Sequence, residues 1–347
     1  MRALQIVKWQ TDPELVEVAR PEPGPGQVVV KVGGAGACHS DLHILHDSSG
    51  DMGHPWQLPF TLGHEVAGWV HAVGSGVTGV VIGQPVAVHG AWGCGTCNRC
   101  RAGVENYCEN PVRQPGLGID GGMAEFLLVP GARHLVPLPD GLDPAAAAPL
   151  TDAGLTPYHA IGRSRGKLGP TATAVVIGVG GLGHMAVQIL KATTAARVVA
   201  VDTKPDALEL ARSLGADHVV AGGEAAVTEI RGLTGGRGAD VVLDFVGSDA
   251  TMQLGVGAAR TLGDLTIVGV AGGTYPVGFF SIPYELSVQT VYWGSRAELV
   301  ELLDLAGRGL IRPEVTTFPL DKAADVYRAL HDGMLSGRAV VVPSGAP

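Results

Sequence analysis

The sequence predicts an α/β protein in which an irregular β-barrel region is followed by a doubly wound parallel sheet. As far as about residue 150, short alternating or β-branched runs are broken repeatedly by glycine and proline. From about Thr173 onward, apolar runs alternate with helix-like segments, which is typical of parallel strands joined by helices. Glycine contributes 52 of the 347 residues, about twice its usual share, so many turns and close backbone approaches are expected.

The first region predicts short strands of a small barrel. Strands are expected at 27–32, 66–70 and 85–88, where valine and alanine dominate. The prolines of segment 21–26 restrict their neighbours, so this segment is expected to be an extended lead-in or turn.

The second region predicts a parallel sheet. The apolar runs 174–177 and 197–202 are each followed by a helical segment, at 182–192 and 205–214 respectively, and Gly215 is placed to end the second helix. Further elements continue the series: strands at 240–245, 265–268 and 288–292, helices near 296–307 and 321–333, and a last strand at 339–342.

Composition excludes several classes of protein. Apolar residues make up 46% of the chain, charged residues 16%, and the net charge is −9. This balance argues against a disordered chain and against a general nucleic-acid binder, which needs a basic surface. No apolar run reaches the ~18 residues of a membrane span, and the first eight residues do not resemble a secretory signal. We therefore expect a soluble, cytoplasmic protein that uses neither nucleic acid nor membrane as a partner.

The glycines at 178, 180 and 183 form the pattern G-x-G-x-x-G directly between an apolar strand and a helix. Gly178 would make the tight turn, Gly180 would let a pyrophosphate approach the backbone, and Gly183 would let helix and strand pack closely. Gly181 belongs to the same turn, and the N-terminus of the helix favours an anion. The motif predicts a dinucleotide site.

Asp202 ends the second strand of this region, 19 residues after Gly183. A carboxylate at this place accepts hydrogen bonds from the adenosine ribose and repels a 2′-phosphate. The sequence therefore favours NAD over NADP. Lys204 instead favours NADP, because a basic side chain can partly accommodate that phosphate.

Four of the five cysteines lie in one loop, with the spacing C-x₂-C-x₂-C-x₇-C: Cys94, Cys97, Cys100 and Cys108. Four thiolates can surround Zn²⁺ as a closed tetrahedron with no position for substrate. Iron–sulfur ligation is the rival interpretation. In either case the loop is expected to be structural rather than catalytic.

The fifth cysteine, Cys38, belongs to a scattered set of titratable residues whose other members are His64 and Asp152. One thiolate, one imidazole and one carboxylate make a three-ligand zinc site with a free position for substrate. Each residue also has an ordinary structural interpretation: a small core residue, a buried histidine and a helix N-cap, respectively. The spacing alone does not decide between the two interpretations.

These motifs together resemble the zinc-dependent medium-chain alcohol dehydrogenases over nearly the whole chain. The matching segments are Cys38-His39-Ser40-Asp41, Gly63-His64-Glu65, Gly93 to Cys108, Asp152-Ala153-Gly154-Leu155-Thr156 and Gly178 to Gly183. The resemblance implies a GroES-like barrel domain of residues 1–153 completed by 293–347, with a Rossmann domain at 154–292. It also implies two zinc ions per chain, NAD, and a homodimer or homotetramer.

The resemblance also assigns the metal ligands. Cys38 and His64 match the first two ligands of the catalytic zinc, and Asp152 stands where many members have a cysteine. Glu65 matches a carboxylate that can approach this zinc, and Asp41 matches the partner that orients the ligand histidine. The four-cysteine loop matches the structural zinc site. The aspartate at 152 favours secondary alcohols and ketones as substrates.

The remaining roles concern the proton and the cofactor. Ser40 and His43 match the two ends of a proton relay from the alcohol to solvent. His39 and Arg338 are expected near the pyrophosphate, and the nicotinamide contacts fall on two further residues: Thr156 and Leu182. The chain is thus predicted to be an NAD-dependent zinc alcohol dehydrogenase that interconverts alcohols with ketones or aldehydes.

Three alternative functions remain open. A zinc polyol or formaldehyde dehydrogenase differs only in substrate. A zinc-free quinone or enoyl reductase should lack Cys38, His64 and the cysteine loop, so it is disfavoured. A non-enzymatic metal module that binds nucleotide would need neither Ser40 nor an open metal site.

Overall fold

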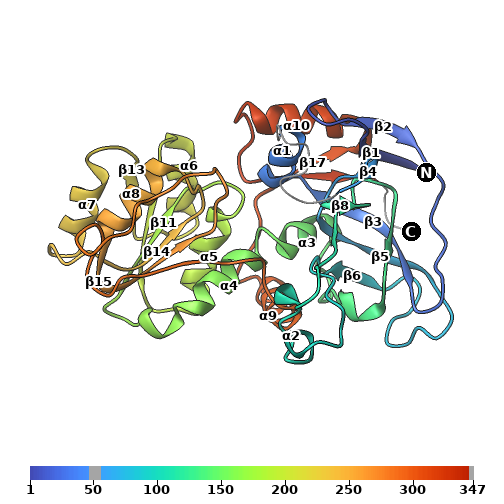
Figure 1. Cartoon of the computed structure of the whole chain (residues 1–347), viewed down its shortest axis with the longest axis horizontal. Helices are drawn as coiled ribbons and strands as arrows, with labels where there is room; N and C mark the ends of the chain where they lie inside the picture. Colours follow the sequence, from blue (N-terminus) through green and yellow to red (C-terminus); the bar gives the residue numbers. More distant parts are fainter. Residues whose placement is uncertain (47–55, 344–347) are drawn as a thin grey trace. The chain divides into compact units, whose positions relative to one another are not determined.

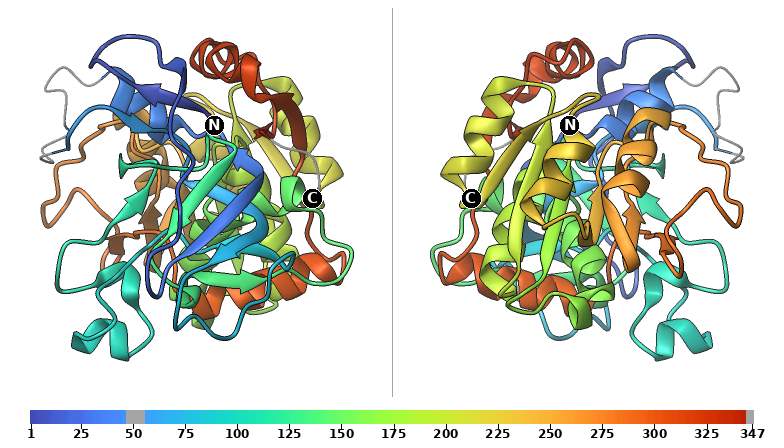
Figure 2. Two further views of the ribbon diagram at one scale, coloured as in Figure 1. Left: turned by 90° about the vertical axis from the view of Figure 1, so that its right-hand side faces the viewer. Right: turned by 90° about the vertical axis from the view of Figure 1, so that its left-hand side faces the viewer.

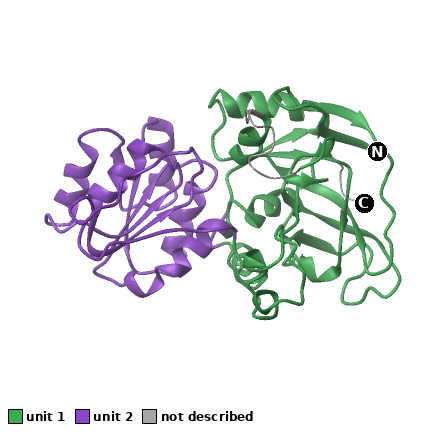
Figure 3. Cartoon of the chain, in the orientation of Figure 1, with its two compact units in different colours: residues 1–155, 294–309, 313–347 green, residues 156–293, 310–312 purple. Residues whose placement is uncertain are grey.

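The structure, a computed structural model, describes residues 1–46 and 56–343 and divides into two compact units (Figure 3). Unit 1 combines three segments: Met1–Leu155, Gly294–Gly309 and Pro313–Pro347. Unit 2 combines two: Thr156–Trp293 and Leu310–Arg312. Within the described ranges, no helix has the length and apolar character needed to cross a bilayer.

The main sheet of unit 1 has the strand order β10-β6-β5-β3-β18-β17, and β9 also pairs with β3 (Figure 1). Its strands are β3 (Val28–Gly36), β5 (Glu65–Val73), β6 (Pro85–Val88), β9 (Phe126–Val129), β10 (Leu135–Pro137), β17 (Val315–Pro319) and β18 (Arg338–Val342). Neighbours are antiparallel except β17 and β18, which run parallel. The last described strand, β18, therefore lies between β3 and the edge strand β17.

Two smaller sheets complete the β-structure of unit 1. One has the order β2-β1-β4, and the other pairs β7 with β8. Their bounds are β1 (Arg2–Ile6), β2 (Glu14–Glu17), β4 (Phe60–Thr61), β7 (Gln114–Pro115) and β8 (Gly118–Ile119). Fully buried side chains such as Leu4, Phe60, Leu127 and Tyr327 join these sheets to one core. Burial of this apolar area stabilises the unit at about 25 cal/mol per Å².

Short helices connect the strands of unit 1. The α-helices are α1 (His39–His46), α2 (Asn98–Arg101), α3 (Pro144–Ala147), α9 (Arg296–Gly307) and α10 (Ala323–His331). The 3₁₀ helices are η1 (Glu105–Tyr107), η2 (Ala132–His134), η3 (Ala148–Thr151) and η5 (Leu320–Lys322). Helix α9 begins with a capping box, in which Ser295 and Glu298 satisfy each other's backbone N–H groups.

Unit 2 contains a parallel sheet of strand order β13-β12-β11-β14-β15-β16. The strands are β11 (Thr173–Ile177), β12 (Arg197–Asp202), β13 (His218–Ala221), β14 (Ala239–Asp244), β15 (Ala259–Ile267) and β16 (Ser287–Thr290). The order reverses direction next to β11, which is the arrangement of doubly wound nucleotide-binding folds. The predicted doubly wound sheet is confirmed.

Helices on both sides of this sheet bury its apolar strands (Figure 2). They are α4 (Leu155–Arg163), α5 (Gly183–Thr193), α6 (Pro205–Ser213), α7 (Ala226–Leu233) and α8 (Asp249–Ala258), with the 3₁₀ helix η4 at Arg165–Lys167. Pro205 occupies the first turn of α6, where its missing N–H is not needed. Gly215, with φ +97°, follows that helix and reverses the chain.

Among the described residues from Thr173 onward, two strands were not anticipated from the sequence. Strand β13 is a short edge strand with only one fully buried apolar residue, Val220, so it carries little of the apolar pattern that predicts strands. Strand β17 contains two threonines and ends at a proline. The helix expected near 321–333 consists of η5 followed by α10, and it ends at His331.

Candidate active site and metal centres

The glycine motif forms the turn between β11 and α5. Gly178 has φ +85°, and a Cβ there would lie 2.6 Å from the side chain of Val246. A Cβ on Gly183 would lie 1.8 Å from the carbonyl oxygen of Gly178, so strand and helix approach too closely for any side chain. Gly180 is exposed, and a Cβ there would meet no atom within 4 Å. The turn thus has a tight side and an open side, as a pyrophosphate site requires.

Asp202 ends β12 beside this turn. One carboxylate oxygen accepts the Val179 N–H at 2.8 Å, and the other accepts the Lys204 N–H at 2.9 Å. These bonds fix the carboxylate next to the glycine turn, where it would meet the ribose of a dinucleotide. Of the other predicted cofactor residues, Thr156 is buried at the start of α4, and Leu182 is half-buried just before α5.

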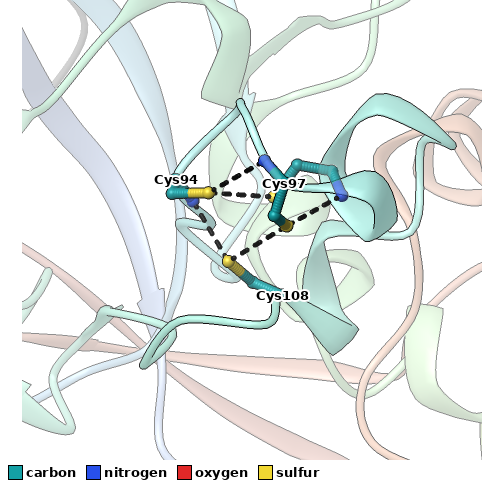
Figure 4. Close-up of side chains that lie close together, drawn as sticks. Cys94, Cys97 and Cys108 are labelled. Atoms are coloured by element: carbon teal, nitrogen blue, oxygen red, sulfur yellow. Dashed lines mark hydrogen bonds between the residues drawn. The ribbon is translucent and has the colours of Figure 1, made fainter.

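The four cysteines of the loop converge. Figure 4 shows Cys94, Cys97 and Cys108 with their sulfurs turned toward one another. The Sγ atoms of Cys97 and Cys108 are 3.8 Å apart, and those of Cys94 and Cys100 are 4.0 Å apart. All four sulfurs lie within 4.8 Å of one another. Four sulfurs at the Zn–S distance of ~2.3 Å form a tetrahedron with edges of about 3.8 Å, so one zinc ion fits.

Backbone N–H groups already point at these sulfurs. Cys94 Sγ accepts the N–H groups of Thr96 at 3.4 Å and of Cys97 at 3.3 Å, and Cys97 Sγ accepts that of Cys100 at 3.4 Å. The hydroxyl and N–H of Thr96, followed by the Cys97 N–H, lower the pKa of Cys94 to about 5. A thiolate is the form that binds metal. In a [4Fe–4S] cluster each thiolate binds a different iron, so the sulfurs would lie farther apart than they do here, and this iron–sulfur alternative fits less well.

The scattered set of titratable residues also converges. Cys38 immediately precedes α1, His64 immediately precedes β5, and Asp152 follows η3. The Nε2 atom of His64 is 3.3 Å from an Asp152 oxygen, which is itself 4.0 Å from Cys38 Sγ. With Glu65, one ligand atom of each residue lies within 4.8 Å of the others. Cys38 and His64 are buried and Asp152 is half-buried, so a thiolate, an imidazole and a carboxylate face one point.

Asp41 holds the imidazole of His64 in position. One Asp41 oxygen lies 3.0 Å from His64 Nδ1, and the other accepts the Tyr327 hydroxyl at 2.8 Å and the Cys38 N–H at 3.1 Å. With its proton on Nδ1, His64 donates to Asp41 and keeps the Nε2 lone pair for a metal, the usual arrangement of metal-binding histidines. Tyr327 was not identified from the sequence, because an aromatic residue on a helix is most often part of the core.

The acidic groups of this set favour a positive charge at His64. Burial lowers the pKa of His64, but the Asp41 carboxylate, Asp152 and Cys38 raise it more, so the result is well above the usual value. Surrounding acidic groups thus attract positive charge to this imidazole. A metal ion would compete with the proton for the same place.

Glu65 and Arg338 form a buried ion pair. Arg338 Nε donates to one Glu65 oxygen at 2.8 Å, its Nη2 donates to the other, and the Ala153 N–H also donates to Glu65 at 3.0 Å. Arg338 is 2% exposed. Its guanidinium is paired with the carboxylate beside the candidate metal site, and its predicted contact with the pyrophosphate stays a prediction. The fully buried carboxylate requires this counter-charge, which explains the pairing.

Helix α1 carries the predicted relay residues. Ser40 is half-buried with its hydroxyl 3.6 Å from Cys38 Sγ, so it borders the metal ligands. His43 lies one turn further along α1 and is half-buried, whereas His39 at the start of the helix is exposed. The i, i+3 spacing places Ser40 and His43 on one face of α1. The proton relay through these two residues stays a prediction.

Two family models match the chain. The model "Alcohol dehydrogenase GroES-like domain" matches residues 24–140, and "Zinc-binding dehydrogenase" matches residues 181–308. An NAD-dependent alcohol dehydrogenase of Sulfurisphaera tokodaii is 37% identical over 99% of this chain and 100% of its own length.

Solved structures agree with these matches. The alcohol dehydrogenase of Aeropyrum pernix is 40% identical with a TM-score of 0.92, covering 99% of this chain and 100% of that one. The D-arabinose dehydrogenase of Sulfolobus solfataricus is 31% identical with a TM-score of 0.86, covering 99% of each chain. The class is thus a zinc-binding dehydrogenase with a GroES-like domain and a Rossmann domain, which confirms the predicted fold class.

Within this class, the chain belongs to the zinc-dependent medium-chain alcohol dehydrogenases. It is therefore an NAD-dependent alcohol oxidoreductase that uses zinc. The zinc-free reductase and the non-enzymatic module are excluded as its class.

Proposed function

We propose that the chain oxidises secondary alcohols to ketones with NAD, and catalyses the reverse reduction, at the set of residues built around Cys38, His64 and Asp152. The observation that carries this proposal is the convergence of these three side chains from distant segments, beside the hydroxyl of Ser40. When bound, zinc supplies Lewis acidity to the substrate oxygen and NAD supplies the hydride acceptor.

The side chains around the site have separate proposed roles. Asp41 and Tyr327 hold the His64 ring so that Nε2 faces the site. Cys38 and Asp152 each supply a negative charge, which makes the site strongly attractive to a divalent cation. Glu65 is engaged on both oxygens by Arg338, so we assign it a positioning role, in which it fixes Arg338 and adds negative potential behind the ligands.

Ser40 is the proposed proton acceptor for the substrate hydroxyl. A serine hydroxyl both accepts and donates, so it can take the proton of the alcohol while passing its own proton onward. His43, one turn along α1, is the proposed next group, since imidazole titrates near neutral pH. The Ser40→Ala variant should retain zinc and NAD binding but lose about 10²–10⁴-fold in kcat, the usual range for general acid–base groups.

Asp202 is the proposed determinant of the preference for NAD. Its carboxylate is held by two backbone N–H groups beside the glycine turn, so a 2′-phosphate would meet a fixed negative charge. Asp202→Gly should relax this preference. If the wild-type enzyme used NADP as well as NAD at matched concentrations, the proposal for Asp202 would fail, and Lys204 would be the first residue to vary.

The alternative substrate class is a polyol or an aldose. It is favoured by the D-arabinose dehydrogenase among the similar structures. The deciding experiment is a comparison of kcat/KM for 2-butanol, 1-butanol and D-arabinose, with NAD and with NADP. We expect 2-butanol with NAD to be the best pair. A higher kcat/KM for D-arabinose would overturn the proposal in favour of the alternative.

The proposal includes a homodimer or homotetramer located in the cytoplasm. It rests on the family resemblance and on the composition of the chain. Light scattering coupled to size-exclusion chromatography measures the oligomeric state directly, and a monomeric mass for the active enzyme would contradict it.

A further inference from the structure

A third cluster of metal-binding side chains lies in unit 1, and it shares no residue with the two sites above. His89 follows β6, Glu105 begins η1 and His134 ends η2. One ligand atom from each of these residues lies within 4.8 Å of the others. Glu105 belongs to the cysteine loop, whereas the two histidines belong to the barrel. The cluster is therefore located where the loop meets the barrel.

The imidazole of His89 is buried with one nitrogen unpartnered. Its Nε2 lies 2.9 Å from the Gly294 carbonyl oxygen, and a carbonyl can only accept, so Nε2 carries the proton. In the neutral ring Nδ1 then carries a lone pair. This Nδ1 has no hydrogen-bond partner and faces a Glu105 oxygen at 3.7 Å. Two acceptor atoms thus face each other, and no described protein group donates to His89 Nδ1.

His134 also has a buried ring nitrogen without a partner. It is 1% exposed, and its Nδ1 is buried without a hydrogen-bond partner. Burial, followed by the charge of Arg133, lowers the pKa of His134 to about 3, and burial also lowers the pKa of His89. Both rings are therefore neutral at pH 7, which is the form of histidine that binds metals. Buried polar atoms without partners are rare in proteins and require an explanation.

We propose that His89, Glu105 and His134 bind a third divalent transition-metal ion, with zinc as the preferred occupant. Two imidazoles and one glutamate are an established ligand set for zinc. Ligand atoms ~2.1 Å from a tetrahedral ion are about 3.4 Å apart, close to the 3.7 Å between His89 and Glu105. A cation would satisfy the facing lone pairs at once, which a single proton over this distance cannot do.

Charge and access define the character of this site. Glu105 is the only anionic ligand, and Arg133 and Arg296 both influence the cluster electrostatically. The site should therefore bind zinc more weakly than the four thiolates do. The Glu105 side chain is 15% exposed while that of His89 is fully buried, so the ion would enter beside Glu105. Once bound, it would fasten the cysteine loop to the ends of β6 and η2.

The first experiment is a zinc-binding titration of the full-length enzyme in a zinc buffer, with bound metal measured by mass spectrometry. Glu105→Gln should bind one zinc fewer per chain than the wild type. Glu109→Gln is the matched control, since Glu109 is an exposed acid of the same loop outside the cluster. It should bind as much zinc as the wild type. Equal zinc binding by wild type and Glu105→Gln would overturn the proposal, whatever the occupancy of the other two sites.

The second experiment needs no variant. Crystals of the wild-type enzyme soaked in zinc are measured at the zinc absorption edge. An anomalous peak between His89 Nδ1 and the Glu105 carboxylate is the expected result. A map with peaks at the cysteine loop and at Cys38 but none at this cluster would overturn the proposal. Because the three positions are separate in the map, failure of this proposal is distinguishable from failure of the proposed active site.

Discussion

The cysteine loop and the set around Cys38 are both candidate zinc sites in unit 1, yet they are built in opposite ways. The loop takes all its ligands from residues 94–108, and its thiols are exposed or half-buried. The other set joins Cys38, His64 and Asp152 from three distant parts of the chain, and two of these three residues are buried. One site is local and chemically uniform, and the other is non-local and mixed.

The two sites therefore need different supporting contacts in order to form. In the loop, N–H groups two or three residues away donate to the sulfurs, so the local backbone prepares the site. Around Cys38, the supporting contacts run from Asp41 to Tyr327 and from Glu65 to Arg338, across most of the sequence. Damage to the loop should therefore appear as lost stability, and damage to the other site as lost activity.

Cys38→Ser should give the largest effect. It removes a thiolate from the site that activates substrate, where Lewis-acid stabilisation is worth several kcal/mol, or roughly 10³-fold or more in rate. The measurement is kcat for 2-butanol oxidation with NAD, together with zinc content and melting temperature. Activity should collapse while the melting temperature stays near that of the wild type. Activity within about tenfold of wild type would remove Cys38 from the active site.

Arg338→Met should be the most destabilising of these changes. It leaves the Glu65 carboxylate, which is fully buried, without its counter-charge, and breaking a buried ion pair costs about 3–5 kcal/mol. The first transition of urea-induced unfolding measures this loss. The double variant Glu65→Gln with Arg338→Met should recover part of it. If Arg338→Met unfolded like the wild type but bound NAD more weakly, Arg338 would act at the pyrophosphate rather than as the counter-charge of Glu65.

Cys97→Ser should reverse the pattern of Cys38→Ser. Loss of one thiolate weakens zinc binding by the loop, and at a zinc concentration 100 times Kd the bound ion contributes about 2.7 kcal/mol. Calorimetry should show a lower melting temperature, while kcat at 25 °C stays near the wild-type value. A parallel collapse of kcat would show that the loop and the active site are not independent.

Tyr327→Phe should give the smallest effect of the four. It removes one donor to Asp41 and leaves the shape of the core unchanged, so His64 is held less firmly. Loss of such a supporting hydrogen bond typically weakens metal affinity about 10–100-fold. Chelator competition measures this affinity. Tyr107→Phe, an exposed tyrosine of the cysteine loop, is the control and should leave the affinity of the Cys38 site unchanged.

The sequence predicts best what is encoded within a few residues. The glycine turn and the four-cysteine spacing each define a geometry over a short segment. The structure shows the tight glycine turn and the four converging sulfurs, as expected. The fold class was predictable for the same reason, because strand–helix alternation is a local pattern. Strand β13 was not, since its single buried valine leaves almost no pattern to read.

What could not be predicted are partners brought together by the barrel. Tyr327 on α10 and the pairing of Arg338 with Glu65 depend on contacts between residues more than 270 positions apart. A single sequence contains no signal for such pairs. The roles of Cys38, Ser40, His43 and Asp152 stay predictions, of which the Cys38→Ser and Ser40→Ala variants test the first two.

The position of β18 between β3 and β17 has a consequence for the order of events during synthesis. Its partner β3 leaves the ribosome about 300 residues earlier, which at 5–20 residues per second is a wait of roughly 15–60 s. Unit 2 is almost continuous in sequence and is complete before β18 is made. Because Arg338 begins β18, the buried carboxylate of Glu65 has no counter-ion until residue 338 has been made. The ligands around Cys38 are therefore synthesised before the nucleotide-binding unit, and the charge that balances Glu65 is synthesised after it.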